Sequence, residues 1–223
     1  MKLSKETLAI LKIFSGINSS IVLKPGSFIM TKTVNNVVFA EATIDDVIDE
    51  ELAIYELSSF LNLVSLVGED AELTLDGEDI VISAGKTRVF YRAANASTIV
   101  TPKNRLTMPV ANVIFELSAD QMQQILRTSR AQNGDVLSIA SEDNKIVIRG
   151  YNRTIDKDCL RPLFAVETAD WDGPDFDFRL NMANMHMKEA DFKVMISSKG
   201  AVKFEGDKIS YVVATEATSK HSF

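Results

Sequence analysis

Near the start of the chain, hydrophobic residues recur at the spacing of an amphipathic helix. Ile10, Phe14 and Ile17 fall on one side of a helix drawn at about 100° per residue. Ser4 stands just before this segment and suits an N-cap, because its hydroxyl can accept a hydrogen bond from a free backbone N–H. The pattern predicts a helix over residues 5–17.

Strand patterns follow this helix. The strings SIVL, SFIMTKT and VVFAEATI are typical of strands, and a Pro-Gly pair and an Asn-Asn pair mark the turns between them. A second helix is predicted over residues 55–66, where Leu57, Phe60, Leu61 and Val64 have helical spacing. The strings AELTL, DIVISA and TRVFYRA predict further strands after it.

The same order of elements recurs in the second half of the chain. Ser118 is again a suitable N-cap, and Met122, Ile125, Leu126 and Ser129 share one helix face. DVLSIAS and KIVIRGY then predict strands, RLNMANMHM a short helix, and DFKVMIS, AVKFEG and KISYVVAT further strands. The shared order indicates an internal duplication. It predicts an α+β fold of two similar lobes, each with two helices packed on antiparallel sheets.

An apolar segment, residues 95–112, links the two expected lobes. It contains two prolines and has no clear periodicity. Its larger hydrophobic residues are Ile99, Val100, Leu106, Met108 and Val110. A link this apolar is expected to pack against other parts of the protein. We place the N-terminal lobe at residues 1–110 and the C-terminal lobe at residues 111–223.

Composition fits a soluble globular protein. The 223 residues are 46% hydrophobic and 25% charged, and the single cysteine excludes an internal disulfide. The start lacks the apolar core of a signal peptide, and no apolar run approaches the roughly 20 residues that span a bilayer. We therefore expect a cytoplasmic protein with no membrane partner.

Charge is unevenly distributed along the chain. The formal net charge is -7, yet basic residues gather on the two corresponding helices. They are Lys2, Lys5, Lys12, Arg127 and Arg130. Exposed helix faces often carry such residues, but their recurrence on the same element of each half favours a positive surface that meets a polyanion. No aromatic residues are interleaved with them, so contact with phosphates is expected rather than base stacking.

Catalytic motifs are nearly absent from the sequence. There is no GxxxxGK, GxGxxG, HExxH or CxxC pattern. Cys159 and His186 could form a nucleophile and base, but a buried thiol and a surface imidazole are the favoured interpretation. We expect no catalytic residues and no cofactor.

Two acidic segments could support other chemistry. The string DWDGPDFDF carries Asp170, Asp172, Asp175 and Asp177, which could hold calcium or magnesium. Its spacing differs from an EF-hand loop and it lacks a bidentate glutamate, so a polar loop that leads into a strand is favoured and no metal is expected. The run EATIDDVIDEEL is typical of a solvated face or loop.

Short strings spread over the whole chain form a recognisable set. They are MKLSK at the start, FIMT at 28–31, NMANM at 181–185, KFEG at 203–206, YVVA at 211–214 and the ending HSF. In these strings the chain resembles the sliding clamps of T-even-type bacteriophages. The resemblance implies a homotrimeric ring of two-lobed subunits, with helices that line the hole and sheets on the outside.

The same resemblance implies partners. The ring would encircle duplex DNA without reading its sequence and would bind the C-terminal tail of the replicative DNA polymerase. It would be loaded by an ATP-driven clamp loader and would serve late transcription factors in the cytoplasm of the infected host. The clamp would not itself be an enzyme.

The resemblance also assigns candidate sites. The five basic residues named above would face DNA. A partner pocket beside the link would use Leu106, Met108, Pro109, Val110, Val212 and Ala214. Subunits would join edge strands, TRVFY of one to the CLRPLF region of the next, through Phe90, Tyr91, Leu163 and Phe164.

One departure and two alternatives accompany this hypothesis. The second helix expected in each half carries almost no positive charge apart from Lys188, so the lining would be unevenly basic. A non-ring interaction or structural protein of the same fold is the main alternative. A nuclease that uses the carboxylates of residues 170–177 is the other, although polar catalytic groups are sparse.

Overall fold

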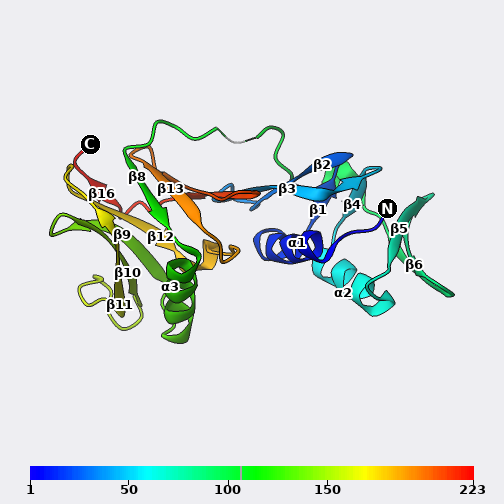
Figure 1. Cartoon of the computed structure of the whole chain (residues 1–223), viewed down its shortest axis with the longest axis horizontal. Coiled ribbons are helices and arrows are strands. Elements are labelled where there is room, and N and C mark those ends of the chain that lie inside the picture. Colours follow the sequence, from blue (N-terminus) through cyan, green and yellow to red (C-terminus); the bar gives the residue numbers. More distant parts are fainter. Residues whose placement is uncertain (106) are drawn as a thin grey trace. The chain divides into compact units, whose positions relative to one another are not determined.

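The computed structural model describes residues 1–105 and 107–223 (Figure 1). The chain divides into two compact units, Met1–Arg105 and Leu106–Phe223. In each unit, helices accompany antiparallel strands, as the expected α+β class requires. The boundary expected after residue 110 falls in the same linking segment and stays a prediction.

The N-terminal unit begins with a helix and continues as short sheets. Its elements are α1 Lys5–Ile17, β1 Ile21–Leu23, β2 Gly26–Lys32, β3 Val38–Ile48, β4 Leu52–Ile54, α2 Leu57–Val67, β5 Glu72–Asp76, β6 Asp79–Ala84, β7 Thr87–Arg92 and the 3-10 turn Ala96–Thr98. β1 pairs with β4, and β2 pairs with β3. A third sheet has the order β5-β6-β7, so β7 is an edge strand. The strand β4 was not predicted from the sequence, and α2 begins at residue 57, two residues after the predicted start at 55.

The predicted first helix is confirmed together with its cap. The Ser4 hydroxyl accepts a hydrogen bond from the Thr7 backbone N–H, 3.2 Å away. The hydrophobic face is buried as expected, and the Phe14 side chain is fully enclosed. Burying a phenylalanine contributes about 1.5–3 kcal/mol, which fixes this helix against its sheet and leaves the opposite face for charge.

The acidic run that was expected to be a solvated face or loop lies mostly within β3. Along this strand Ala42, Ile44 and Ile48 are buried, while the carboxylates fall between them. One carboxylate has a structural role, since Asp46 accepts a hydrogen bond from the Ser4 backbone N–H at 2.7 Å. Its negative charge at the start of α1 also suits the helix dipole.

Asp46 gives a pH-dependent prediction for stability. Burial raises its pKa, but hydrogen bonds from Thr7 and Ser4 outweigh burial and leave the pKa below its ordinary value. The ionised carboxylate therefore favours the folded state above the unfolded pKa of about 4, and this contribution is lost as pH falls through the lower folded pKa. We expect Asp46→Asn to reduce the free energy of unfolding by about 1–2 kcal/mol at pH 7 and by less below pH 4, in urea titrations.

The matched control is Asp143→Asn. Asp143 lies exposed in a turn of the C-terminal unit, so its substitution should leave the free energy of unfolding nearly unchanged at both pH values. An equal effect of the two substitutions would contradict the capping role of Asp46.

The C-terminal unit repeats the helix-and-sheet plan with more strands. Its elements are β8 Val113–Leu117, α3 Ala119–Ala131, β9 Val136–Glu142, β10 Lys145–Tyr151, β11 Phe164–Asp170, β12 Phe176–Asn181, the 3-10 turn Met182–Asn184, β13 Phe192–Ser197, β14 Ala201–Glu205, β15 Ile209–Ala214 and β16 Lys220–His221. One sheet has the order β11-β10-β9-β12-β16, so β11 is an edge strand. β8, β13, β14 and β15 pair in the order β15-β14-β13-β8.

The second predicted main helix is also confirmed. Ser118 and Gln121 form a reciprocal capping box at the start of α3. The Ala119 backbone N–H also donates to the Asp191 carboxylate at 2.7 Å. The first helix of each unit therefore begins on a serine cap and on a carboxylate that comes from a distant part of the chain.

The short helix expected over residues 179–187 is wrong. Phe176, Phe178 and Leu180 are buried in alternation with half-buried polar residues, so this segment is a strand as far as Asn181. Asn181 then caps a single 3-10 turn, because its side chain accepts a hydrogen bond from the Ala183 backbone N–H. The strand alternation and the capping asparagine outweigh the helix propensity of the methionines.

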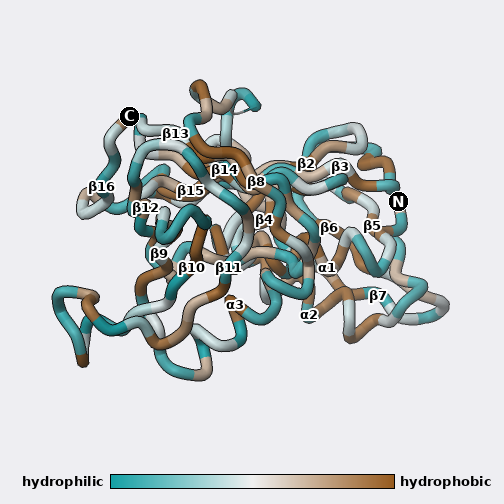
Figure 2. Tube along the Cα trace, turned by 60° about the vertical axis from the view of Figure 1, so that its left-hand side comes forward, coloured by the Kyte–Doolittle hydropathy of each residue, from teal (hydrophilic) through white to brown (hydrophobic). Residues whose placement is uncertain are grey.

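Each unit has its own hydrophobic core. Large, fully buried side chains include Phe14 and Phe60 in the N-terminal unit and Phe178, Phe192 and Tyr211 in the C-terminal unit. Figure 2 shows hydrophobic stretches within strands and helices, whereas several connecting segments are hydrophilic. These cores pack the buried faces of the helices against the sheets of their own unit.

Candidate nucleic-acid interface and partner surfaces

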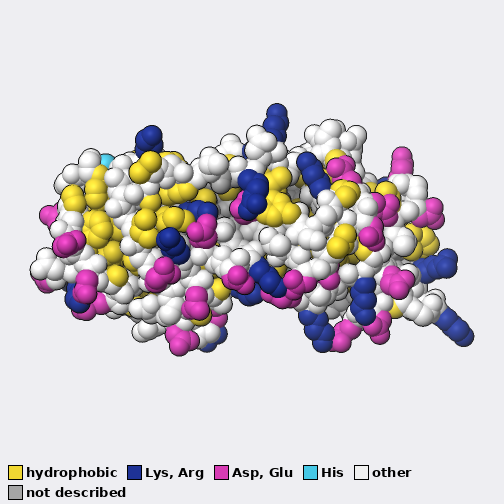
Figure 3. All heavy atoms as spheres, turned by 45° about the horizontal axis from the view of Figure 1, so that its top comes forward, with side chains coloured by type: hydrophobic (Ala, Val, Ile, Leu, Met, Phe, Trp, Pro, Cys, Tyr) yellow, Lys and Arg dark blue, Asp and Glu magenta, His cyan; other side chains and the backbone are white. Residues whose placement is uncertain are grey.

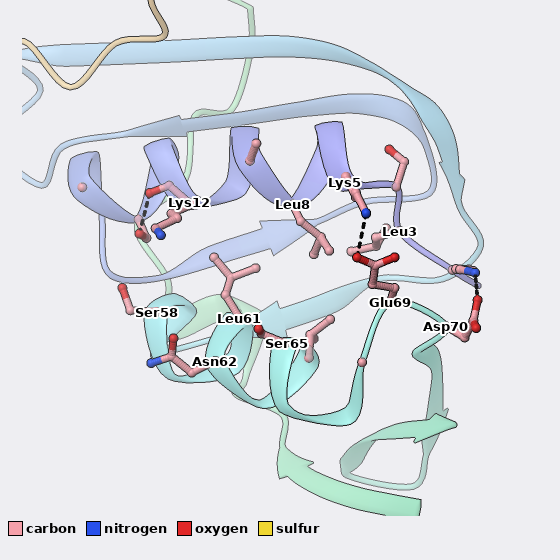
Figure 4. Close-up of a pocket in the computed structure, with 17 residues that line it drawn as sticks. Leu3, Lys5, Leu8, Lys12, Ser58, Leu61, Asn62, Ser65, Glu69 and Asp70 are labelled. Carbon is pink, nitrogen blue, oxygen red and sulfur yellow. Dashed lines mark hydrogen bonds and ion pairs between the residues drawn. The ribbon is translucent and has the colours of Figure 1, made fainter. Parts of the chain in front are cut away.

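Three basic residues of the N-terminal unit line an open hollow between α1 and α2. Its volume is about 1040 Å³, and Lys2, Lys5 and Lys12 contribute to its lining. Leu8 of α1 and Leu61 of α2 lie across it from one another (Figure 4). The structure therefore brings the three predicted lysines of this unit onto one surface.

Two of these lysines are paired with carboxylates. The Lys5 Nζ lies 2.6 Å from Glu69 Oε1, and the Lys2 Nζ lies 2.5 Å from Asp70 Oδ1 (Figure 4). The hydrogen bond between Lys2 and Asp70 raises the pKa of the lysine and lowers that of the carboxyl. Lys12 is exposed and has no ion-pair partner among the residues that the structure describes. Its ammonium group is therefore available to an external anion.

The two predicted arginines of the C-terminal unit lie together on α3. The Arg127 Nη2 is 3.4 Å from Glu189 Oε2, and the same carboxylate accepts a hydrogen bond from the Gln123 side chain at 2.7 Å. Arg130 donates to the Met185 carbonyl at 3.3 Å. The pKa of Glu189 lies below its ordinary value, mainly because Gln123 donates to it and further because Arg127 is close.

The sequence did not predict the three carboxylates that pair with these basic residues in the two units. Glu69 and Asp70 follow the end of α2, and Glu189 follows the 3-10 turn, so each is distant in sequence from its basic partner. Acidic residues beside a helix end are common in any sequence. Only the fold shows that these three face lysines and an arginine.

The link residues differ in how far they are buried. Ile99 packs with Val22 and Ala53, and the Asn18 side chain donates to the Val100 carbonyl at 3.2 Å, so the start of the link is anchored as expected. Val110 is instead 85% exposed.

The other described residues of the expected partner pocket are less exposed than Val110. Met108, Pro109, Val212 and Ala214 are half-buried. Leu106 lies outside the described residues. On the face drawn in Figure 3, hydrophobic side chains gather over the C-terminal unit, and acidic side chains are scattered over both units.

The expected subunit-contact residues divide into exposed and internal side chains. Phe90 is 62% exposed on the edge strand β7. Tyr91 faces its own unit, where its ring meets Phe60 edge to face at 5.3 Å and its hydroxyl accepts a hydrogen bond from the Glu56 backbone N–H. Of the two residues, Phe90 is therefore the one that is free to meet a partner.

On the other expected edge, only Phe164 of the CLRPLF string belongs to the strand β11. Its ring covers Gly150, because a Cβ added there would lie 2.2 Å from the ring. Leu163 precedes the strand and is half-buried near Gly134. Both predicted edges are edge strands of their own sheets, as pairing between subunits would require.

The acidic segment near residue 170 has internal partners. Asp170 pairs with Lys145, and Asp177 pairs with Arg179 and accepts a hydrogen bond from Ser138. Within the described residues, no group of three or more histidine, cysteine, aspartate or glutamate side chains is arranged to hold a metal ion.

The environment of Cys159 does not favour the nucleophile that was weighed for this residue. Burial raises the pKa of the Cys159 thiol, which opposes a role as an activated nucleophile. Across residues 1–105 and 107–223, every helix is too short or too polar to cross a bilayer.

Comparison with known proteins identifies the family. Residues 4–101 match the family of DNA polymerase processivity factors, and residues 114–217 match the C-terminal domain of the gp45 sliding clamp. The chain is 47% identical to the sliding clamp of Escherichia phage RB69 and 44% identical to that of Enterobacteria phage T4, with all of each chain covered.

Solved structures share the fold at low sequence identity. A proliferating cell nuclear antigen of A. fulgidus, solved with the C-terminal region of FEN-1, has a TM-score of 0.68 at 13% identity, with 96% of each chain covered. The corresponding antigen of Entamoeba histolytica has a TM-score of 0.67 at 11% identity, with 94% of each chain covered. From the full-length matches at high identity and the two family matches, we conclude that this chain belongs to the sliding-clamp family of DNA polymerase processivity factors.

Proposed function

We propose that this chain forms a ring that encircles duplex DNA and tethers the replicative DNA polymerase for processive synthesis. One observation carries the proposal: in a chain of this family with a net charge of -7, four of the five predicted basic residues lie on the first helix of each unit, and Lys2 lies just before α1. The basic helices would attract phosphate, and the acidic remainder of the surface would repel it. DNA would therefore be favoured only at the helices. The clamp itself has no catalytic role in this proposal.

Sliding requires contacts that are weak and mobile. Lysine and arginine side chains are long, and they can reach phosphates directly or through water without reading base edges. Such contacts depend on salt and not on sequence. The ring would remain on DNA by topology, so affinity can stay low.

Ring formation is proposed to join β7 of one subunit to the β11 region of the next. Both are edge strands whose outer backbone groups have no partner strand in their own sheets. A closed homotrimer would remove both edges in every subunit. Phe90 would supply the main hydrophobic contact from β7.

The function is tested by polymerase extension on a primed circular template with the clamp loader and ATP. We expect this protein to lengthen products in a single binding event and to require the loader on closed circles. Products of unchanged length with and without the protein would contradict the proposal. Loader action, service to late transcription and location in the host cytoplasm rest on family resemblance and are part of the same proposal.

A tail of the polymerase is proposed to bind beside the link, at Met108, Pro109, Val110, Val212 and Ala214. The half-buried and exposed hydrophobic residues there suit an apolar segment. A clamp-fold neighbour has also been solved with the C-terminal region of a partner.

This site gives a binding prediction. Met108→Glu places a charge in the apolar site and should weaken binding of a polymerase C-terminal peptide roughly tenfold or more, because a charge would have to be desolvated. Fluorescence anisotropy with a labelled peptide measures the change. Val34→Glu, at an exposed turn of the N-terminal unit, is the control and should bind as the unmodified protein does. Normal binding by the Met108 variant would count against this site.

A further inference from the structure

We propose that Glu69, Asp70 and Glu189 compete with DNA phosphates for the basic side chains and so keep the contact with DNA weak enough for sliding. This inference rests on the proposed function and assigns a role in it to three acidic residues. The three acidic residues would set how strongly the protein contacts DNA, whereas the basic residues make that contact possible.

The N-terminal unit supplies two of the three carboxylates. Gly68 ends α2 with a φ of +117°, a backbone conformation that favours glycine, and Glu69 and Asp70 follow it directly. This turn brings the two carboxylates to the rim of the hollow that carries Lys2 and Lys5. Each carboxylate then takes one ammonium group, at 2.6 Å for Lys5 and 2.5 Å for Lys2.

The C-terminal unit reaches the same arrangement by a different route. There the second α-helix is replaced by a 3-10 turn, yet Glu189 still comes from the segment after it and contacts the first helix of the unit. Gln123 holds the Glu189 carboxylate at 2.7 Å, which directs it toward Arg127. Because both units place acids against their basic helix although the local structures differ, a shared function explains the arrangement better than helix geometry.

The ion pairs are exposed to solvent, which suits their carboxylates as competitors of phosphate. The Lys5 and Glu69 side chains are 78% and 77% exposed, so their attraction is weak and exchanges easily with solvent. A phosphate that approaches Lys5 must displace the carboxylate, which remains nearby and repels it. The net gain from each contact is therefore small, and the energy should vary little as the ring moves along the duplex.

The pairing is selective among the five basic residues. Lys2, Lys5 and Arg127 have carboxylate partners, whereas Arg130 donates to a carbonyl group and Lys12 has no ion-pair partner in the described part of the chain. Phosphate contact at Lys12 therefore requires no displacement. Few basic side chains would then attract DNA without competition. Removal of the three carboxylates would increase that attraction.

The test compares two triple variants with the same change in charge. E69Q/D70N/E189Q removes the proposed competitors. E78Q/D170N/E205Q removes carboxylates that also pair with a basic residue, namely Arg92, Lys145 and Lys203, but that lie at the ends of β-strands or in a strand turn. Binding to a short labelled duplex of mixed sequence is measured by fluorescence anisotropy over a series of salt concentrations.

We expect the first triple variant to bind DNA roughly tenfold more tightly than the unmodified protein at low salt. Its affinity should also fall more steeply with salt: the slope of log K against log salt should steepen by up to about 2.7 for each subunit that engages three more phosphates. The control variant should bind within about twofold of the unmodified protein. Single-molecule tracking of loaded rings should show slower diffusion for the first variant only.

Equal behaviour of the two triple variants would overturn the inference, whether both bind more tightly or neither does. The outcome for the proposed function is separate, because it is read from the unmodified protein. If that protein does not lengthen polymerase products when the loader and ATP are present, the proposed function fails. If the first triple variant does not assemble or fold, the single variant E69Q is compared with E78Q in the same assay, with an expected difference of about two- to threefold.

Discussion

Reversing the charge of Lys12 and Arg127 together, as K12E/R127E, should shorten the products of clamp-dependent synthesis by at least about tenfold. Each subunit would lose two phosphate contacts and gain two repulsive charges in a ring held near DNA. Lys12 is the basic residue of α1 that has no carboxylate partner in the described residues, and Arg127 is one of two exposed arginines of α3. Product lengths on a primed circular template, with loader and polymerase present, measure the effect.

The double variant should remain folded. Both side chains are exposed, and the buried faces of α1 and α3 do not include them, so the thermal unfolding midpoint should change little. The control is K86E/K199E, which reverses two exposed lysines and changes the net charge equally. Unchanged product length with K12E/R127E, or equal losses in both variants, would contradict the assignment of these residues to the DNA-facing surface.

Replacing Phe90 with aspartate should prevent ring formation at concentrations where the unmodified protein is assembled. In the free subunit, the substitution removes a largely exposed ring and should cost little stability. In the proposed ring, it buries an unpaired charge at each contact between subunits, a penalty that recurs three times in a trimer. Sedimentation velocity should show a shift from trimer to monomer, and clamp-dependent synthesis should be lost.

The matched control lies on the other edge of the same sheet. Leu75→Asp introduces the same charge on β5, which pairs with β6 from the opposite side to β7. This variant should assemble normally. A trimer formed by the Phe90 variant would place the contact elsewhere, and dissociation of both variants would indicate a general effect on the sheet.

Much of the fold could be predicted where burial follows a simple period. The helices at 5–17 and from Ser118 were found because their apolar residues recur at helical spacing, and both serine caps are present in the structure. The helix predicted over residues 179–187 is wrong because short stretches with methionines suit either a helix or a strand. Pairing with β9 makes the part up to Asn181 a strand.

The candidate sites were predictable to a lesser extent. The basic residues could be named because they recur on corresponding helices. The direction of Tyr91 could not be deduced, because strand alternation does not show which face packs on α2. The acidic partners could not be found from the sequence either, since Glu69 is distant from Lys5, and Glu189 from Arg127. These contacts depend on how the chain folds back and not on local spacing.

Encirclement of DNA by a closed ring is tested most directly by the native mass in solution, measured by light scattering over a dilution series. The chain has a mass of 24.6 kDa, and the proposed ring predicts about three times that value for a trimer. Dissociation of this trimer on dilution would agree with contacts made through two edge strands. A monomer at every concentration would contradict encirclement and would leave the basic helices as ordinary solvated surfaces.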